Sequence, residues 1–252
     1  MDRPTNPSQF RTRLRRWSLL LVLVCVGSGC SAMSTGQNTH GVRLYQKGDY
    51  NAALNQFQQA MKTDPNNADS YYNMAATMHR MGTTKQKDPA MLQQAEALYN
   101  QCLDRNPNHA DCHRGLAVLL VETNRTDRAF TLLKNWAVRS PQSPEPRIEI
   151  ARLYEEFGDK KTAELQLQQA IQLDQSNPRA WAALASLRES SGDYQQAMAN
   201  YQRAFSLNNY NTAVANRLAA LNKATGSSTG TTPTQAPGGT RTVHANVPSA
   251  RY

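Results

Sequence analysis

The sequence predicts an all-α protein, an α-solenoid of five helical hairpins followed by one capping helix. Three observations predict it. A Gly-Asp pair recurs at Gly48, Gly158 and Gly192, and the last two glycines are 34 residues apart. Small and large apolar residues follow each glycine at the three- and four-residue spacing of one helix face. The same pattern extends over most of the chain, and an internal period of this length indicates stacked repeats.

Residues 1–29 are predicted to be an export signal. Basic residues at 11–16 precede the apolar stretch Trp17–Val26, which only Ser18 interrupts, and small residues follow it. The stretch is shorter than the ~20 residues that a membrane-spanning helix needs. The order of basic, apolar and small segments therefore predicts export of the chain.

The small-residue sequence Gly27–Cys30 resembles the lipobox of bacterial lipoproteins. The resemblance implies cleavage before Cys30 and lipidation of that cysteine. Ser31 in the next position implies sorting to the outer membrane, facing the periplasm. Two alternatives stay open, namely ordinary cleavage near Ala32 and an uncleaved short anchor. Residues 30–36 are predicted to be a linker.

The repeats are aligned on their small and large residues. The small positions are Ala53, Ala60, Ala163, Ala170, Ala197 and Ala204, and the large ones are Phe57, Leu167 and Tyr201. In the third copy Asn124 takes the place of the turn glycine, because asparagine tolerates the left-handed backbone region. This alignment places the repeat body at 37–211, with repeats at 34–67, 68–109, 110–143, 144–177 and 178–211.

The pattern resembles the tetratricopeptide repeat, a 34-residue pair of antiparallel helices with small residues where the helices cross. The resemblance implies a right-handed solenoid with a concave groove. Two features depart from the pattern. The second repeat has eight extra residues. Within them, the pair Asp88-Pro89 predicts the N-cap and the first residue of the second helix of that repeat. Trp136 stands at a position where alanine is usual, so we expect helix packing to loosen or rotate there.

The chain is predicted to end in a cap and a tail. Residues 212–224 form an amphipathic helix with Thr212 as its N-cap, and Val214, Leu218 and Leu221 make its apolar face. Residues 225–252 are rich in Gly, Ser, Thr and Pro, a composition that predicts disorder.

Composition and motifs argue against enzymes and nucleic-acid binders. The chain lacks the common metalloprotease, phosphate-loop and nucleophile-elbow motifs, so we expect no enzymatic activity, no cofactor and no small-molecule substrate. The net charge of +9 arises largely outside the repeats, because five basic residues precede Cys30. Residues 30–224 carry 21 basic and 18 acidic residues, which does not favour nucleic acid as a partner.

Cysteine and histidine gather around the turn at Pro107. Cys102 and Cys112 stand five residues on either side of it, and His109 and His113 lie in the same segment. In an oxidising compartment a Cys102–Cys112 disulfide is plausible, and its short loop would contribute roughly 3 kcal/mol. Two buried thiols remain an alternative. The spacing matches no paired zinc knuckle, so no metal site is predicted.

The family resemblance implies that the concave groove binds a protein or peptide through first-helix residues. The candidates are Tyr45, Tyr72, His79, Arg80, Arg114, Val118, Glu122, Ile148, Arg152 and Glu156. The predicted function is that of an exported, membrane-anchored scaffold or assembly factor for an envelope complex. This plan resembles the pilotin lipoproteins of type IV pilus assembly and lipoproteins that scaffold cell-wall enzymes. The alternatives are a soluble periplasmic, chaperone-like peptide binder and, ranked lower, a nucleic-acid-binding helical repeat protein.

Overall fold

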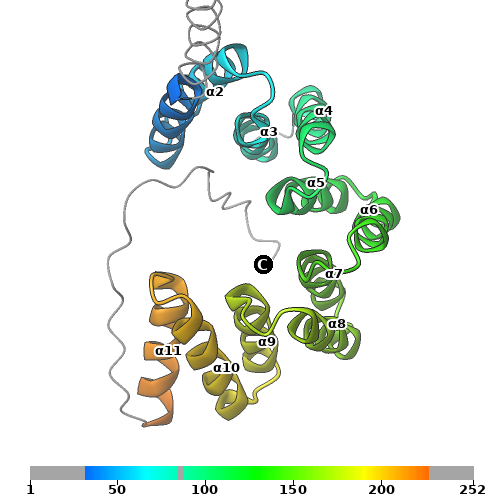
Figure 1. The fold of residues 1–252 in the computed structure, drawn as a ribbon, viewed down its shortest axis with the longest axis vertical. Helices are drawn as coiled ribbons and strands as arrows, with labels where there is room; N and C mark the ends of the chain where they lie inside the picture. Colours follow the sequence, from blue (N-terminus) through cyan, green and yellow to red (C-terminus); the bar gives the residue numbers. More distant parts are fainter. Residues whose placement is uncertain (1–31, 85–87, 227–252) are drawn as a thin grey trace, which may run out of the picture.

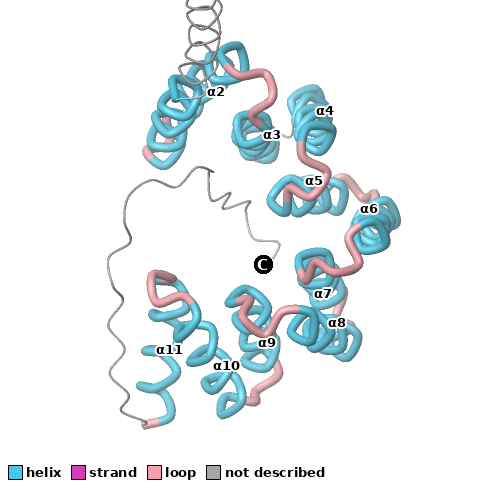
Figure 2. Tube along the Cα trace, viewed as in Figure 1, coloured by secondary structure: helices cyan, strands magenta, loops and turns pink. Residues whose placement is uncertain are grey.

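The computed structural model describes residues 32–84 and 88–226, which are helical apart from short turns and contain no strand (Figure 2). The predicted signal 1–29, Cys30 and the tail from 227 onward lie outside the described residues. After a helix at residues 32–46, the labelled helices follow in chain order. They are α2 (Tyr50–Thr63), α3 (Ala68–Thr83), α4 (Pro89–Arg105), α5 (Ala110–Glu122), α6 (Thr126–Arg139), α7 (Glu145–Glu156), α8 (Lys160–Leu173), α9 (Pro178–Ser190), α10 (Tyr194–Leu207) and α11 (Thr212–Thr225).

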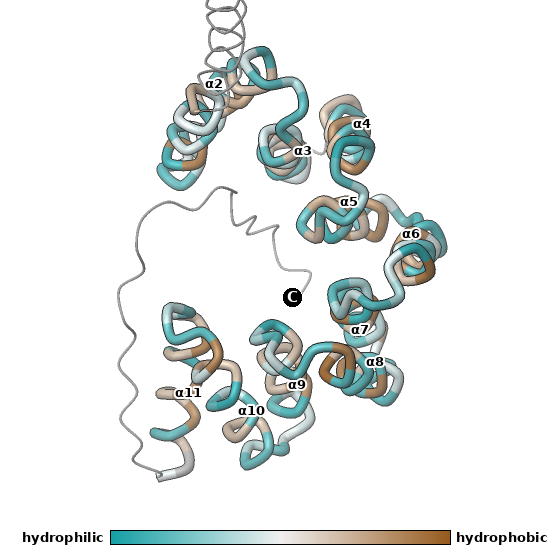
Figure 3. Tube along the Cα trace, in the orientation of Figure 1, coloured by the Kyte–Doolittle hydropathy of each residue, from teal (hydrophilic) through white to brown (hydrophobic). Residues whose placement is uncertain are grey.

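The helices stack into a curved arc rather than around one central core. Helices α3, α5, α7 and α9 line the inner side of the curve, and α4, α6 and α8 line its outer side (Figure 1). Hydrophilic and hydrophobic residues mix along every helix, and no helix is hydrophobic throughout (Figure 3). Within the described residues, no helix combines the length and apolarity that crossing a membrane requires.

The turns inside the hairpins adopt the backbone conformation that the sequence predicts. Gly48, Gly158 and Gly192 have φ values of 82°, 82° and 84°, and Asn124 has a φ of 60°. Glycine enters this left-handed region without steric cost. The residue after each of the three glycines is an aspartate that caps α2, α8 or α10 by accepting a backbone N–H of the first turn. The repeated Gly-Asp pair therefore ends one helix and starts the next.

The alanines predicted at helix crossings are buried, each no more than 1% exposed. Phe57, Leu167 and Tyr201 fill the spaces beside them. The buried apolar residues form three clusters along the arc. The first reaches from Val42 to Leu153, the second from Ile148 to Leu187, and the third from Ala185 to Leu221. Burial is thus distributed along the stack, as expected where each repeat contacts its neighbours.

Two local predictions need correction. Residues 30–36 were expected to be a linker, yet the chain is helical from residue 32. The reason is packing, since Ser34 is fully buried and its hydroxyl donates to the Ala60 carbonyl at 3.1 Å. The cap of α11 is Asn211 and not Thr212, because the Asn211 side chain accepts the Val214 N–H. The apolar face of α11 is buried as predicted.

The extra residues of the second repeat lengthen its second helix. Asp88 caps α4 by accepting the N–H groups of Ala90 and Met91, and Pro89 is the first helical residue, as the sequence predicts. As a result α4 has 17 residues, whereas α2, α8 and α10 each have 14.

Candidate functional site

The ten predicted groove residues divide by accessibility into two sets. Tyr45, Tyr72, His79, Val118 and Ile148 are buried, and Ile148 has no exposed surface with which to contact a ligand. Arg80, Arg114, Glu122 and Arg152 are half-buried, and Glu156 is exposed. The accessible set, which we call the inner-face polar set, lies on α3, α5 and α7. It carries both positive and negative charge.

A buried carboxylate organises the centre of the inner face. Glu149 on α7 is 3% exposed and accepts hydrogen bonds from Arg114 of α5 at 2.9 to 3.1 Å. Arg179 of α9 donates to the same carboxylate at 2.6 Å, and Arg152 lies 3.7 Å away. Glu145 also pairs with Arg179. Glu149 therefore links α5, α7 and α9, which are the first helices of three successive repeats.

The charges around Glu149 decide its protonation. Burial by itself raises the pKa of this carboxyl group, but Arg114, Arg152 and Arg179 outweigh burial and hold the pKa at about 2. Burial lowers the pKa of Arg152, and the attraction of Glu149 offsets this only in part. Arg152 is thus the least well compensated cation of the cluster.

A second polar connection joins α3, α4 and α5. The Nε2 atom of His79 lies 2.8 Å from Glu122, and its Nδ1 atom lies 3.3 Å from the Tyr99 hydroxyl. His79 is 1% exposed, so it holds Glu122 in place from beneath the inner face. The sequence predicts both residues as groove residues but does not predict that they contact each other.

The cysteines on either side of Pro107 lie on α4 and α5 and meet beside the turn that joins these helices. The structure joins Cys102 to Cys112, with their Cα atoms 6.5 Å apart. The two sulfurs and a ring nitrogen of His109 lie within 4.8 Å of one another, which is compact enough for a metal. However, His109 Nδ1 accepts the Cys112 N–H and Nε2 lies 3.1 Å from Asp69. Both ring nitrogens are therefore occupied, and the geometry favours a disulfide.

We expect Cys102 and Cys112 to be recovered as a disulfide-linked pair when the protein is made in an oxidising compartment. Mass spectrometry after alkylation without reductant measures this directly. Reduction should lower the free energy of unfolding by roughly 3 kcal/mol, because the unfolded chain regains loop freedom. Protein made in a reducing compartment is the control. Full alkylation of Cys102 in protein made in the oxidising compartment would contradict the pairing.

His113 and Trp136 stack where the repeat pattern is broken. Their ring centroids are 4.0 Å apart and the ring planes differ by 8°. Trp136 also donates from Nε1 to Asn108 at 3.1 Å. Trp136 itself is 1% exposed, so the loosening or rotation expected there stays a prediction. Two clefts lie beside α6, one of about 360 Å³ that includes Tyr154 of α7 and one of about 320 Å³ that includes Leu116 of α5, and Trp136 lines neither.

Burial makes His113 an acid-sensitive residue. Burial lowers the pKa of His113 to about 4. The hydrogen bond that Nε2 donates to the Pro107 carbonyl at 2.9 Å acts in the opposite direction, because it favours the charged form, but burial outweighs it. The unfolded chain, with a pKa near 6.5, binds the proton more readily. The contribution of neutral His113 to the free energy of unfolding is therefore fully present above pH 6.5. The free energy of unfolding should fall by about 3 kcal/mol as the pH drops to 4.

Chemical denaturation between pH 7 and 4 measures this slope. We expect His113→Gln to remove most of it, because glutamine does not titrate. The matched control is His40→Gln, since His40 is exposed on the helix at residues 32–46. An unchanged slope in the His113 variant would show that another group causes the acid sensitivity.

Glu149 and Arg179 are the main inner-face residues that the sequence analysis missed. Glu149 interrupts the apolar pair Ile148 and Ile150, an unusual place for an acidic residue. It also follows Arg114 by 35 residues, close to one repeat length, so that opposite charges recur at neighbouring positions of successive repeats. A search for complementary charges at the repeat period would have found the pair.

Models of tetratricopeptide repeats match residues 41–82, 90–139, 126–187 and 178–221. No curated protein matches the chain. Among solved structures, a tetratricopeptide repeat protein of Thermus thermophilus is 25% identical, with a TM-score of 0.56 over 75% of this chain and 98% of that one.

Yeast Tom70 is 20% identical, with a TM-score of 0.57, and the match covers 69% of this chain but 36% of Tom70. Pseudomonas aeruginosa PilF is 16% identical, with a TM-score of 0.48 over 79% of this chain and 87% of that one. The family models together span the helices from the first hairpin into α11. The chain therefore belongs to the tetratricopeptide repeat family and is a protein–protein interaction scaffold.

Proposed function

We propose that this scaffold is exported, anchored to the membrane by a lipid on Cys30, and holds a protein partner on its inner face. The observation that carries the proposal is the inner-face polar set, whose side chains come from three successive first helices. Charged side chains held in fixed positions on a curved surface give specificity to peptide recognition. The anchoring rests on the sequence around Cys30 alone.

The charges of the inner face indicate the kind of partner. Arg80 is a cationic position on α3, and Glu122 and Glu156 are anionic positions on α5 and α7. An extended peptide or amphipathic helix with acidic residues at one end and basic residues at the other would match this order. Arg114 and Arg152 are engaged by Glu149, and Glu122 is held by His79.

Crosslinking in cells, followed by identification of the co-purified proteins, tests the scaffold role. The informative variant combines Arg80→Glu with Glu156→Arg, which reverses the charge order while leaving the Glu149 cluster intact. The matched control combines Asp104→Lys with Lys161→Glu on α4 and α8, where both residues are exposed. We expect at least a tenfold loss of partner with the first variant only. Equal recovery with both would contradict binding at the inner face.

The identity of the partner then selects the pathway. Secretin or pilus subunits would support a pilotin-like assembly factor, and cell-wall enzymes would support a wall-synthesis scaffold. Recovery of cytosolic or nucleic-acid-associated proteins only would contradict export.

Fractionation of wild type and Cys30→Ala tests the anchor. We expect wild type in the membrane fraction and the variant in the soluble periplasmic fraction. Wild type that is already soluble in the periplasm would favour the alternative of a chaperone-like peptide binder. The control is Cys25→Ala, which removes a cysteine of the apolar stretch and should leave fractionation unchanged.

A further inference from the structure

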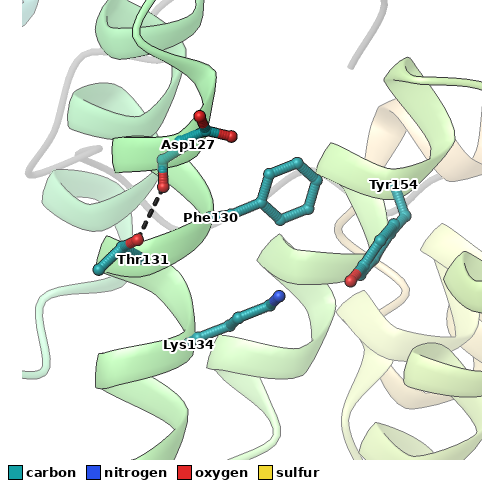
Figure 4. A pocket seen from close by; sticks show the side chains of 5 residues that line it. All are labelled: Asp127, Phe130, Thr131, Lys134 and Tyr154. Atoms are coloured by element: carbon teal, nitrogen blue, oxygen red, sulfur yellow. Dashed lines mark hydrogen bonds between the residues drawn. The ribbon is translucent and has the colours of Figure 1, made fainter.

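Helix α6 carries an exposed stripe on the outer side of the arc. Asp127, Thr131 and Lys134 are exposed and follow one another at helical spacing, and Val138 continues the stripe with 79% of its surface exposed. Beside the stripe is the cleft of about 360 Å³ between α6 and α7 (Figure 4). The stripe and the cleft form one surface, which we call the α6 face.

The centre of the α6 face is aromatic. Phe130 lies 4.9 Å from the Tyr154 ring and 6.0 Å from the Phe157 ring, measured between centroids. Phe157, at the end of α7, is 51% exposed. In Figure 4 Phe130 extends from α6 toward Tyr154, with the Asp127 and Lys134 side chains on either side of it. Phe130 and Tyr154 are half-buried and Phe157 is exposed, and partly accessible aromatic side chains that gather in this way are typical of protein-binding surfaces.

The two charges are arranged symmetrically about the aromatic centre. Asp127 and Lys134 are separated by seven residues, which corresponds to two turns and about 10 Å along the helix axis. Phe130 and Thr131 are midway between them. Neither Asp127 nor Lys134 forms an ion pair with another described residue. Lys134 instead approaches the face of Phe130, 5.4 Å from the ring centroid.

This arrangement is complementary to itself. If a second α6 lies antiparallel to the first, Asp127 of one copy is opposite Lys134 of the other, and the reverse pair forms at the same time. The exposed Thr131 side chains of the two copies then lie near the two-fold axis, with the half-buried Phe130 ring of each copy beside them. We propose that two copies of this chain associate through their α6 faces in this antiparallel manner. A two-fold interface requires a self-complementary surface, and the order Asp127, Phe130, Lys134 supplies one.

The association leaves the inner face open, because α6 lies on the outer side of the arc (Figure 1). Two scaffolds joined back to back would present two inner faces directed away from each other. The inference therefore goes beyond the proposed function and does not depend on it.

Charge reversal in two differently tagged full-length copies tests the proposal. The copies are expressed together, extracted in detergent, purified through one tag and probed for the other. Wild-type copies should co-purify. Two copies with Asp127→Lys should lose at least tenfold in recovery, since the introduced lysine of each copy would face Lys134 of the other. Two copies with Lys134→Asp should lose as much.

Mixing the variants separates this geometry from other contacts. A copy with Asp127→Lys and a copy with Lys134→Asp should recover near wild-type co-purification. In this mixed pair the two substituted side chains have opposite charges and face each other, and the native Lys134 of the first copy faces the native Asp127 of the second. Two copies that carry both substitutions should also recover. Arg203→Glu, an exposed charge reversal on α10, is the control and should have no effect.

Three results would overturn the proposal. They are the absence of co-purification in wild type, undiminished recovery of either single variant with itself, and failure of the doubly substituted copies to recover. Circular dichroism of each variant checks that helix content is retained, which is expected because the substituted side chains are exposed. Association through detergent or a shared partner would not follow the charge pairing.

Discussion

Glu149→Gln is expected to lower the free energy of unfolding by about 3 to 5 kcal/mol. The substitution removes the carboxylate that Arg114, Arg152 and Arg179 share, and it leaves three half-buried arginines with only Asp111 and Glu145 as paired acids. The low pKa of Glu149 gives a consistent value. Its fall from 4.5 to about 2 on folding contributes about 3 kcal/mol above pH 4.5, which is lost as the pH drops toward 2.

Urea denaturation at pH 7 measures the loss. Glu156→Gln is the matched control, because Glu156 is on the same helix and is exposed. We expect its effect to be within about 0.5 kcal/mol. If Glu149→Gln were as mild as the control, the cluster would contribute nothing net to stability, and the arginines would have to find water or other partners.

Trp136→Ala is expected to cost about 3 to 5 kcal/mol, the usual range for removing a large buried aromatic side chain. The indole is 1% exposed, stacks on His113 and donates to Asn108. Alanine is the common residue at this position of the repeat, but here the neighbouring helices are built around the larger ring. The variant should therefore leave a void instead of restoring standard packing.

Val138→Ala on the same helix is the control for Trp136→Ala, because Val138 is exposed and its truncation should change stability little. The Trp136 variant should also weaken the acid sensitivity assigned to His113, since water would reach the imidazole. Denaturation at pH 7 and pH 5 measures both effects. A Trp136→Ala protein as stable as wild type would mean that α6 moves inward and closes the space.

The sequence predicted the repeat geometry well because that geometry depends on local chemistry. The left-handed turns at Gly48 and Asn124, the buried alanines and the Asp88 cap each follow from one or two neighbouring residues. The helix that begins at residue 32 was missed because its first turn forms through a contact with Ala60, which lies 26 residues away from Ser34.

The inner face was predicted less completely, because the register of a repeat shows which way a residue faces but not how much of it stays exposed. Tyr72 and His79 are on the predicted helix, yet both are buried, and Tyr99 of the following helix packs against each ring. Glu149 was missed for the opposite reason. An acidic residue between two isoleucines has no place in an apolar pattern, and only its arginine partners on two other repeats explain it.

Helix α7 belongs to two of the three apolar clusters. Ile150 and Leu153 are part of the first, whereas Ile148 and Ala151 are part of the second. If the chain were tethered at one end and pulled through a bound partner, tension would reach α7 from both directions. The helices at the two ends of the arc, each held by a single cluster, would unfold first, and α7 would be among the last to unfold.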